Sequence, residues 1–253
     1  MVKYSICITH RNNVNTVKES LGSILSQLNQ DFEVIVVDSK STDGSLDILR
    51  RYSEEGRIKL LEQRCSRGKG RQIALEHANG DIILSNLDTD EVYSPHFNSL
   101  LEIYKQSGHR KVLLAISGIR KGERERQNIT IAPRDFLEMI GGWRDVNYGE
   151  DWDLWKRAAE HDRFVVIAFP LVSGSDPSVN RHGLRLRFTR YISMIQLGRP
   201  TFANEKRVSL SRRLIYLAAR GAALFKPRFP GTLDFDPYDS KYLITPPINL
   251  APS

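Results

Sequence analysis

Long apolar runs and cysteines are both scarce in this chain of 253 residues. No stretch approaches the ~18 uninterrupted apolar residues of a membrane-spanning helix, so we expect no transmembrane segment. The start, MVKYSICITHRNN, reaches polar residues too early to predict a signal peptide. Only two cysteines, Cys7 and Cys65, are present, which argues against a disulfide framework and suits a reducing compartment. The expected location is therefore cytoplasmic.

Acidic residues are almost missing from one segment. Between Arg181 and Arg228, twelve Lys and Arg residues accompany a single acid, Glu205, which gives the segment a charge of +11. Because the whole chain carries +7, the remainder carries −4. Such an asymmetry indicates an anionic partner, whether nucleic acid, a membrane surface or a phosphorylated substrate. Aromatic residues are not interleaved with the cations as a base-stacking surface requires, so we expect no nucleic acid partner.

Apolar residues recur at helical spacing within this basic segment, over residues 184–195 and 210–225. Such helices could pack on the rest of the protein as ordinary core. Basic flanks are equally typical of a helix that lies in a membrane interface, where each cation near an anionic surface adds about 1 kcal/mol. The second interpretation places the protein peripherally on the inner face of the membrane.

Strand-like and helix-like segments alternate along the first 90 residues. Apolar runs at residues 4–8, 32–37, 58–61 and 82–84 predict strands, and the apolar spacing between them predicts helices. The nearly continuous apolar run at 32–37 is typical of a strand buried on both faces of a parallel sheet. The alternation predicts an α/β fold with a mostly parallel central sheet.

Polar clusters follow three of these strands, at residues 9–12, 38–39 and 88–91. Ligand sites in parallel sheets lie at the carboxyl ends of the strands, so the clusters indicate a nucleotide site. Within the third cluster, Asp88 and Asp90 can converge on Mg²⁺ or Mn²⁺ if the backbone turns there. A D-x-D pair is also common in solvated turns, and the motif alone favours that simpler interpretation.

Glu150 and Asp151 follow Gly149 at the predicted start of a helix. The helix dipole favours acids in a first turn, which explains the pair without any chemistry. A carboxylate beside Trp152 and Trp155 could instead act as a general base.

Basic residues near the predicted site are weaker signals. Lys69 and Arg71 stand among glycines at a helix start, where they could meet a diphosphate or form a solvated loop. His182 follows the last predicted strand among cations, and as a lone histidine it is more typical of a surface residue.

Five segments in a fixed order change this weighting: SICI at 5–8, VVDSKSTDGS at 36–45, GKGRQIALEHANGD at 68–81, LDTDE at 87–91, and GGWRD with GEDWDLWKRA within 141–158. The succession resembles the family 2 glycosyltransferases of GT-A fold over about residues 4–170. The resemblance implies inverting transfer from a nucleotide-diphosphate sugar, UDP- or GDP-linked, with Mn²⁺ or Mg²⁺ as cofactor. The Q-x-x-R-W signature of processive members is absent, which favours transfer of a single sugar.

The resemblance also implies roles for individual residues on the donor side. Asp38 matches the acid that binds the donor base, and Asp43 matches a structural acid of the same loop. Asp88 would contact the nucleotide part of the donor, and Asp90 would bind the metal ion. The remaining donor-site candidates are Thr9, Arg11, Lys69 and Arg71.

On the acceptor side, Asp151 matches the catalytic base and Glu150 a residue that orients acceptor or base. His182 falls where relatives place a residue near the metal or diphosphate. Ser39 stands where a second Asp is usual, and Thr9-His10-Arg11 replaces a common Pro-Thr-Tyr, so the donor nucleotide stays open. The acceptor is expected to be a glycan, a lipid or another hydroxyl compound, with a lipid-linked or membrane-surface acceptor favoured by the basic segment.

The expected organisation is a catalytic domain at residues 1–180, with a nucleotide half to about residue 91 and an acceptor half after it. Residues 181–253 are expected to form a basic helical extension and an extended tail. A sugar-phosphate nucleotidyltransferase of related fold would need a glycine-rich N-terminal loop, which residues 8–13 lack. A non-catalytic protein that only binds nucleotide sugars is disfavoured, because the chain has both acid pairs, Asp88 with Asp90 and Glu150 with Asp151.

Overall fold

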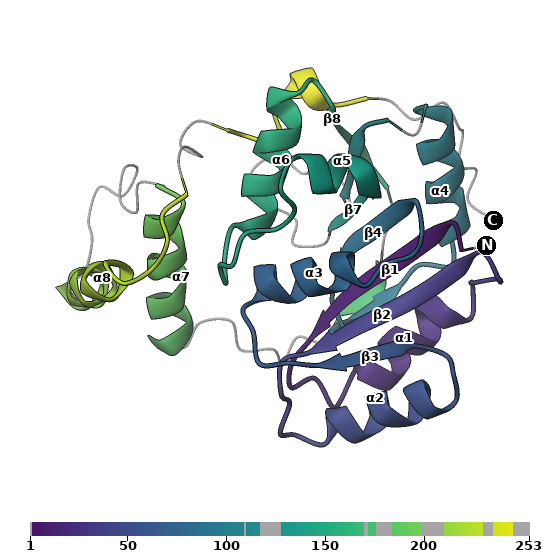
Figure 1. The fold of residues 1–253 in the computed structure, drawn as a ribbon, viewed down its shortest axis with the longest axis horizontal. Helices are drawn as coiled ribbons and strands as arrows, with labels where there is room; N and C mark the ends of the chain where they lie inside the picture. Colours follow the sequence, from purple (N-terminus) through teal and green to yellow (C-terminus); the bar gives the residue numbers. More distant parts are fainter. Residues whose placement is uncertain are drawn as a thin grey trace.

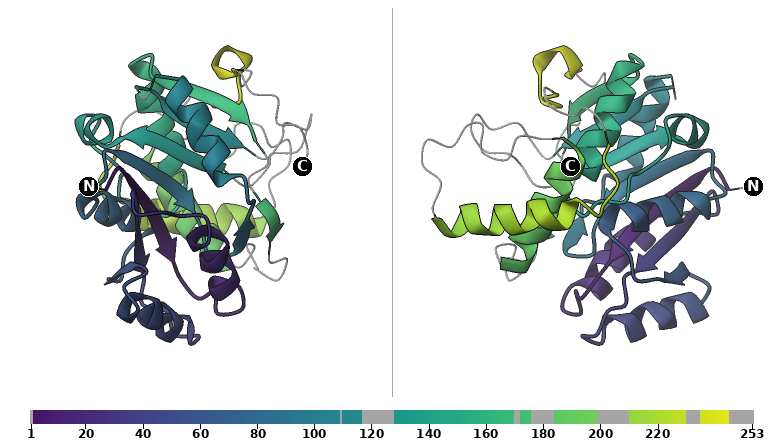
Figure 2. Two further views of the ribbon diagram at one scale, coloured as in Figure 1. Left: turned by 90° about the vertical axis from the view of Figure 1, so that its right-hand side faces the viewer. Right: turned by 60° about the vertical axis from the view of Figure 1, so that its left-hand side comes forward.

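A computed structural model describes residues 2–108, 110–116, 128–169, 172–175, 184–198, 210–229 and 235–244. In these ranges a seven-stranded sheet carries helices on both of its faces, and a helix pair stands to one side (Figures 1 and 2). The expected α/β fold with a mostly parallel sheet and a helical C-terminal region is therefore confirmed.

The large sheet has the strand order β3-β2-β1-β4-β7-β6-β8, and β7 alone runs antiparallel to its neighbours. Its strands are β1 (Tyr4–His10), β2 (Phe32–Asp38), β3 (Lys59–Glu62), β4 (Ile82–Leu87), β6 (Val112–Ile116), β7 (Asn128–Pro133) and β8 (Phe164–Ala168). A second, two-stranded sheet pairs β5 (Glu91–Tyr93) with β9 (Val172–Ser175).

Each face of the large sheet has its own hydrophobic core, because side chains alternate along a strand. In β1, Ile6 and Ile8 face a core completed by α1 (Val17–Leu25), α2 (Ser45–Glu54) and α4 (Phe97–Gln106). Cys7 faces the other core, completed by α3 (Arg67–Glu76), α5 (Arg134–Met139) and α6 (Glu150–Glu160). Both faces are covered, which explains why the strands are apolar at nearly every position.

Strand β4 is irregular where it approaches the acidic cluster. Ile6 of β1 pairs with Leu84, whereas Ile8 pairs with Leu87, so β4 has one extra residue in this interval. Asn86 lies there in the left-handed region, with φ of 69°, and its amide donates to Asn128 Oδ1 at 2.7 Å. A bulge of this kind re-aims the residues that follow it, here Asp88 to Asp90.

The C-terminal part divides into two pieces. Helices α7 (Leu184–Gln196) and α8 (Leu210–Ala223) pack against each other beside the sheet domain (Figure 1). Residues 235–244, expected as an extended tail, instead include a short 3-10 helix, η1 (Ser240–Tyr242), and return to the edge strand β8. Leu243 bridges Val166, and Tyr242 packs edge-on against Phe164. The returning segment thereby covers part of an otherwise open sheet edge.

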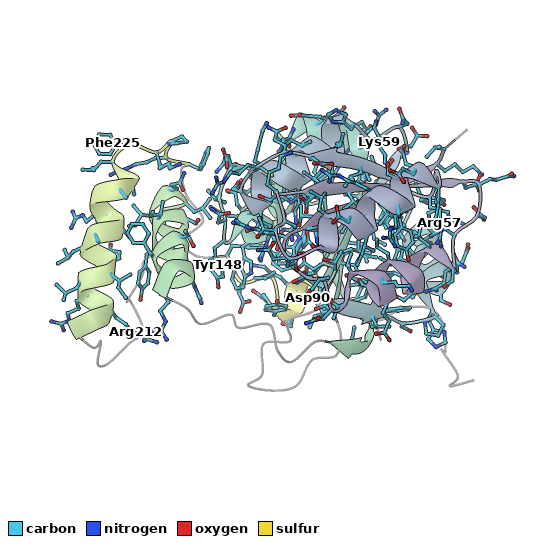
Figure 3. The ribbon with its side chains drawn as sticks, turned by 90° about the horizontal axis from the view of Figure 1, so that it is seen from below. Arg57, Lys59, Asp90, Tyr148, Arg212 and Phe225 are labelled. Atoms are coloured by element: carbon cyan, nitrogen blue, oxygen red, sulfur yellow. The ribbon has the colours of Figure 1, made fainter. Side chains whose placement is uncertain are left out.

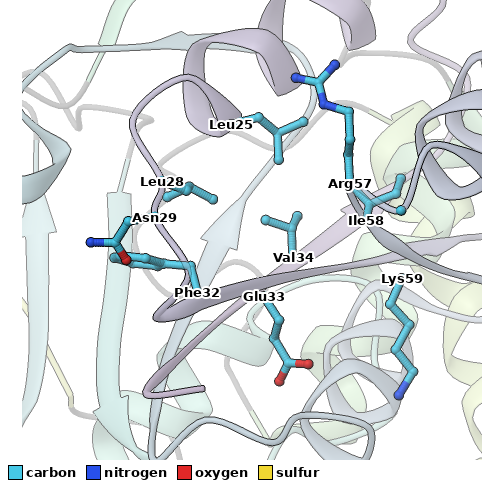
Figure 4. A pocket seen from close by; sticks show the side chains of 10 residues that line it. Leu25, Leu28, Asn29, Phe32, Glu33, Val34, Arg57, Ile58 and Lys59 are labelled. Atoms are coloured by element: carbon cyan, nitrogen blue, oxygen red, sulfur yellow. The ribbon is translucent and has the colours of Figure 1, made fainter. Parts of the chain in front are cut away.

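A surface pocket lies at the amino ends of β2 and β3, lined by Leu25, Leu28, Phe32 and Arg57 among others (Figure 4). This is the end of the sheet opposite to the polar clusters, so the pocket is separate from the predicted nucleotide site. In the part of the chain that the structure describes, every helix is too short or too polar to cross a bilayer.

Candidate active site

The carboxyl ends of β1, β2 and β4 meet at one edge of the sheet. Parallel pairing aligns His10 with Asp38 and Ile8 with Leu87, so the loops that follow these strands are neighbours. The three polar clusters of the sequence therefore lie together, as strand-end clusters of a parallel sheet should.

Thr89, the central residue of the D-x-D turn, is anchored by the loop after β1. Its hydroxyl accepts a hydrogen bond from the Asn13 amide at 3.0 Å, and its carbonyl accepts one from the Thr16 hydroxyl at 2.6 Å. Thr89 is completely buried, while Asp88 beside it is partly exposed. Fixing the middle residue fixes the direction of both flanking carboxylates.

His10 links the D-x-D turn to the loop after β2. Its Nδ1 lies 2.6 Å from the Thr89 hydroxyl, and its Nε2 lies 2.8 Å from the Ser45 hydroxyl. Ser45 donates its proton to the Asp43 carboxylate, so it must accept from His10, which therefore carries its proton on Nε2. Nδ1 then accepts from Thr89, and one continuous chain of hydrogen bonds joins the two loops.

The charge state of His10 follows from its burial. The ring is almost inaccessible to water, and this burial lowers its pKa, although Asp38, with Oδ2 at 4.0 Å from Nε2, favours the protonated form. A neutral ring with its proton on Nε2 agrees with this hydrogen-bond chain.

The loop after β2 is built around two aspartates. Both carboxylate oxygens of Asp38 accept hydrogen bonds from Ser41, from its backbone N–H at 2.9 Å and from its hydroxyl. Asp43 accepts from the backbone N–H groups of Val14 and Ser45. Burial raises the pKa of Asp43, but the bonds from Ser45 and Val14 outweigh this and lower it. Asp38 is 0% exposed, so its carboxylate is occupied by the hydrogen bonds of its own loop.

Tyr93 holds the other side of the D-x-D turn. Its hydroxyl accepts a hydrogen bond from the Asp88 backbone N–H at 2.8 Å and donates one to the Asp88 carbonyl at 3.0 Å. Burial, followed by the charges of Glu91 and Asp88, raises the pKa of Tyr93 well above its ordinary value. The phenol therefore stays protonated and can donate.

Helix α3 packs tightly against the segment that precedes α6. A methyl group on Gly68 would lie 2.0 Å from the Arg144 carbonyl oxygen, and Gly68 N–H donates to the Val146 carbonyl at 3.0 Å. Ser66 caps α3 by accepting from Lys69 N–H at 3.1 Å and donates to Asp145. The glycines of the basic segment therefore serve helix packing rather than a phosphate loop.

This close packing brings Arg71 of α3 to the start of α6. Arg71 Nη1 lies 3.0 Å from Glu150 Oε1, across 79 positions of sequence, and also contacts the Asp151 carboxylate. Arg71 and Glu150 are 3% and 1% exposed. Burial lowers the pKa of Arg71, and the charges of Glu150 and Asp88 partly offset this. Each buried charge thus has a partner, without which its burial would be very costly.

A second arginine, Arg67, also interacts with both acid pairs. Its Nε lies 3.9 Å from Glu150, and its side chain is 48% exposed. Partial desolvation lowers the pKa of Arg67, but the charges of Glu150, Asp88 and Asp90 outweigh this and raise it. Two arginines therefore lie within electrostatic reach of both the D-x-D turn and the Glu150-Asp151 pair.

The sequence pattern described as glycosyl transferase family 2 matches residues 5–154, which is more than half of the chain. The chain belongs to glycosyl transferase family 2. The matched range contains both acid pairs, both arginines and all the loops described above.

Several characterised or named relatives of this family 2 chain are bacterial. A poly(ribitol-phosphate) beta-N-acetylglucosaminyltransferase of Staphylococcus aureus, TarS, is 29% identical over 119 residues, which cover 45% of this chain and 21% of TarS. A poly(ribitol-phosphate) beta-glucosyltransferase of Bacillus spizizenii is 38% identical over 96 residues, or 36% of this chain and 15% of that protein. An uncharacterized glycosyltransferase of Nostoc is 29% identical over 111 residues, or 42% and 34%. The match thus spans about a third or less of these relatives' length.

Solved structures show that the family 2 chain has the GT-A fold. TarS with UDP-GlcNAc superposes with a TM-score of 0.57 at 18% identity, covering 89% of this chain and 74% of that one. A mannosyltransferase of Pyrobaculum calidifontis, in complex with GDP-Man and Mn²⁺, gives 0.59 at 21% identity, covering 88% and 70%. Identities this low establish the shared fold, and the expected GT-A class is confirmed.

The other donor-site candidates of this family 2 chain lie around the same edge. Thr9 packs against Gly70 of α3, and Arg11 is exposed in the loop after β1. The Lys69 ammonium lies 3.9 Å from Glu76 on its own helix. Ser39, where a second aspartate is usual, donates its hydroxyl proton to the Cys65 carbonyl at 2.9 Å. His182 lies outside the described residues.

The side chains at the turn fit a hard divalent cation. Asp88 and Asp90 offer carboxylate oxygens, the ligands that Mg²⁺ and Mn²⁺ prefer, on a turn whose middle residue is fixed. Within the described ranges no group of three or more His, Cys, Asp or Glu side chains forms a closed metal site. Two carboxylates that leave positions to water and substrate phosphates are what such a cation usually receives.

Sequence reasoning missed three residues of the site: His10, Thr89 and Tyr93. His10 and Thr89 act through hydrogen bonds to segments distant in sequence, whereas the Tyr93 hydroxyl bonds the backbone of Asp88, five residues away. The one available signal was their polarity inside otherwise apolar strands or turns, which marks a buried polar group that needs a partner.

Proposed function

We propose that this chain is a metal-dependent inverting glycosyltransferase. It would move a single sugar from a UDP- or GDP-linked donor to an acceptor hydroxyl or phosphate. The observation that supports the proposal best is the buried Arg71, which pairs with Glu150 and Asp151 and is electrostatically coupled to Asp88. This arrangement would hold a donor-binding turn and an acid pair for the acceptor in one site.

On the donor side, Asp88 and Asp90 would hold Mn²⁺ or Mg²⁺. The metal, when bound, supplies positive charge that stabilises the leaving diphosphate. Arg67, half exposed beside the same turn, adds a fixed positive charge for the diphosphate. The hydrogen bonds to Thr89 and Asp88 keep the turn in one conformation, so little reorganisation is needed when the donor binds.

On the acceptor side, Asp151 would accept the proton of the acceptor hydroxyl while its oxygen attacks the anomeric carbon. Asp151 is partly exposed, whereas Glu150 is buried against Arg71. Asp151, with 18% of its side chain exposed, is therefore the carboxylate that an acceptor would reach, and Glu150 would position Arg71 and the start of α6. Attack from the face opposite to the diphosphate inverts the configuration.

The acceptor and the location complete the proposal. A lipid-linked or membrane-surface acceptor, with the protein cytoplasmic and peripheral at the inner face of the membrane, agrees with the +11 charge of residues 181–228. The names of the TarS and Bacillus spizizenii relatives mention poly(ribitol-phosphate), an anionic polymer, which also agrees with a basic acceptor region.

A donor panel tests the proposal directly. UDP-, GDP- and TDP-sugars are incubated with the full chain and Mn²⁺ or Mg²⁺, and binding and hydrolysis are measured with and without EDTA. Asp151→Asn should abolish turnover and leave donor binding nearly intact, whereas Glu160→Gln, at the exposed end of the same helix, should change neither. Absence of both binding and turnover across the panel would refute the proposal, and loss of donor binding in Asp151→Asn would refute its role as the base.

A further inference from the structure

Helix α8 exposes a continuous apolar stripe to solvent. Leu214 and Leu217 of the helix are each 58% exposed, and Leu224 and Phe225, in the turn that follows Ala223, are 68% and 89% exposed. Leu214 and Leu217, three positions apart, lie on one side of the helix, and the Leu224 and Phe225 N–H groups, bonded to the Gly221 and Ala222 carbonyls, continue its winding. Clustered exposure of large apolar side chains is unusual on a free protein surface and marks an interaction site.

The opposite side of α8 accounts for its packing in the fold. Ala219 and Ala223 are buried, and Tyr216 meets Tyr191 of α7 edge-on at 5.8 Å between ring centroids. Viewed from below, α8 lies on the outer side of α7, with Phe225 at its end (Figure 3). Among the described residues, the stripe therefore faces away from the rest of the protein.

Cations, and no acids, accompany the stripe. Arg213 and Arg220 are exposed along one edge of it, and Lys226 and Arg228 are exposed just after the helix. Neither α7 nor α8 contains an Asp or Glu. The surface thus combines an apolar strip with positive charge on its flank.

The charge decides which partner fits this surface. Pairing with a second copy would bring two +11 segments together, and such like-charge contact opposes association. Nucleic acid would satisfy the arginines but not three exposed leucines. An anionic bilayer satisfies both, because leucines and phenylalanine enter the acyl boundary while arginines meet the headgroup phosphates.

We propose that α8 docks on an anionic lipid surface through Leu214, Leu217, Leu224 and Phe225, with Arg213 and Arg220 at the headgroups.

The position of α7 gives this docking a consequence for the acceptor. The Arg190 guanidinium of α7 stacks on the Tyr148 ring at 4.1 Å, and Ser193 accepts from the Asn147 backbone N–H at 3.1 Å. Both contacts are to the segment immediately before Glu150. Helix α7 thereby links the docking helix to the acceptor half of the site, so that docking would hold this half near the bilayer, a consequence that rests on the proposed function.

Vesicle flotation of the full chain tests the docking. Vesicles of phosphatidylcholine with 30% phosphatidylglycerol, about the anionic content of a charged leaflet, are compared with pure phosphatidylcholine. We expect binding to the anionic vesicles and at least tenfold weaker partition for Leu214→Ser/Leu217→Ser. Arg213→Gln/Arg220→Gln should lose roughly 30-fold on anionic vesicles, about fivefold per cation. Met139→Ser, which changes an exposed apolar residue of α5, should bind like the parent.

Three results would overturn the docking: no binding to the anionic vesicles, equal binding of the double-serine variant and the parent, or a dimer in light scattering that the serines dissociate. Leu224→Ser/Phe225→Ser, at the exposed end of the helix, repeats the test should the first pair disturb folding. Donor hydrolysis is measured on the same samples. Flotation without hydrolysis contradicts the proposed transfer reaction and leaves the docking intact, whereas hydrolysis without flotation contradicts the docking and the peripheral location and leaves the transfer reaction intact.

Discussion

Tyr93→Phe isolates the hydroxyl that holds the D-x-D turn. The substitution keeps the ring, which is 3% exposed, and removes the group that bonds both the N–H and the carbonyl of Asp88. Each lost bond costs about 0.5–1.5 kcal/mol net, and more where the stranded backbone group cannot reach water. Because Asp88 is partly exposed, water can replace some of this, so we expect a loss of about 2 kcal/mol in the free energy of unfolding.

The more informative consequence concerns ligand binding. A turn without this brace samples other conformations, so Mn²⁺-dependent donor affinity should fall roughly tenfold, a cost of about 1.4 kcal/mol. Urea unfolding gives the stability, and calorimetric titration of UDP- or GDP-sugar with Mn²⁺ gives the affinity.

Tyr104→Phe provides a matched control. Tyr104 is also buried, and its hydroxyl donates to the Lys111 carbonyl at 3.2 Å, remote from the D-x-D turn. This variant should lose stability and keep donor affinity. Equal donor affinities in the two variants would show that the hydroxyl of Tyr93 has no part in shaping the turn.

The remaining predictions concern His10, Gly68 and Arg71. The pKa of His10 is lowered from 6.5 in the folded state, so below that pH the unfolded chain binds more protons than the folded one. The free energy of unfolding should therefore fall as the pH drops below about 6.5. Urea unfolding of His10→Asn should show a weaker fall. Gly68→Ala places a methyl group against a backbone carbonyl and should lower the melting temperature strongly. Gly22→Ala, where the new methyl group meets open space, should not. Similar melting temperatures of the two variants would contradict the close packing of α3 at Gly68. Arg71→Leu leaves the buried Glu150 carboxylate without its partner and should lower the free energy of unfolding by about 3–5 kcal/mol in urea. The double variant Arg71→Leu/Glu150→Leu should recover part of this loss. No recovery would mean that the broken ion pair does not cause the loss of stability.

Local sequence patterns predicted most of the sheet. The four early strands agree with the observed β1 to β4 because apolar runs record burial on both faces, which is a local property. The acid pairs stood out for a similar reason: charges beside buried segments are conspicuous. The first α3 turn was harder, since its glycines and cations left a diphosphate contact and a solvated loop equally open, whereas Gly68 and Gly70 prove to be packing positions.

Partners distant in sequence could not be predicted in the same way. Nothing local to Arg71 indicates Glu150, and nothing local to His10 indicates the hydroxyls of Ser45 and Thr89. The return of residues 235–244 to β8 was also hidden, because Phe235, Tyr238 and Tyr242 are separated by polar residues typical of an extended tail.

The sequence by itself determined the fold class, the family and the position of the acids along the strands. Tertiary structure decided how these acids are held: the bulge in β4, the His10 chain between two loops, and the ion pair between α3 and α6. It also decided that the apolar stripe of α8 is exposed rather than buried, since helical periodicity defines a face without saying what covers it. Periodicity follows from neighbours along the chain, whereas hydrogen bonds and exposure depend on which distant segments the fold brings together.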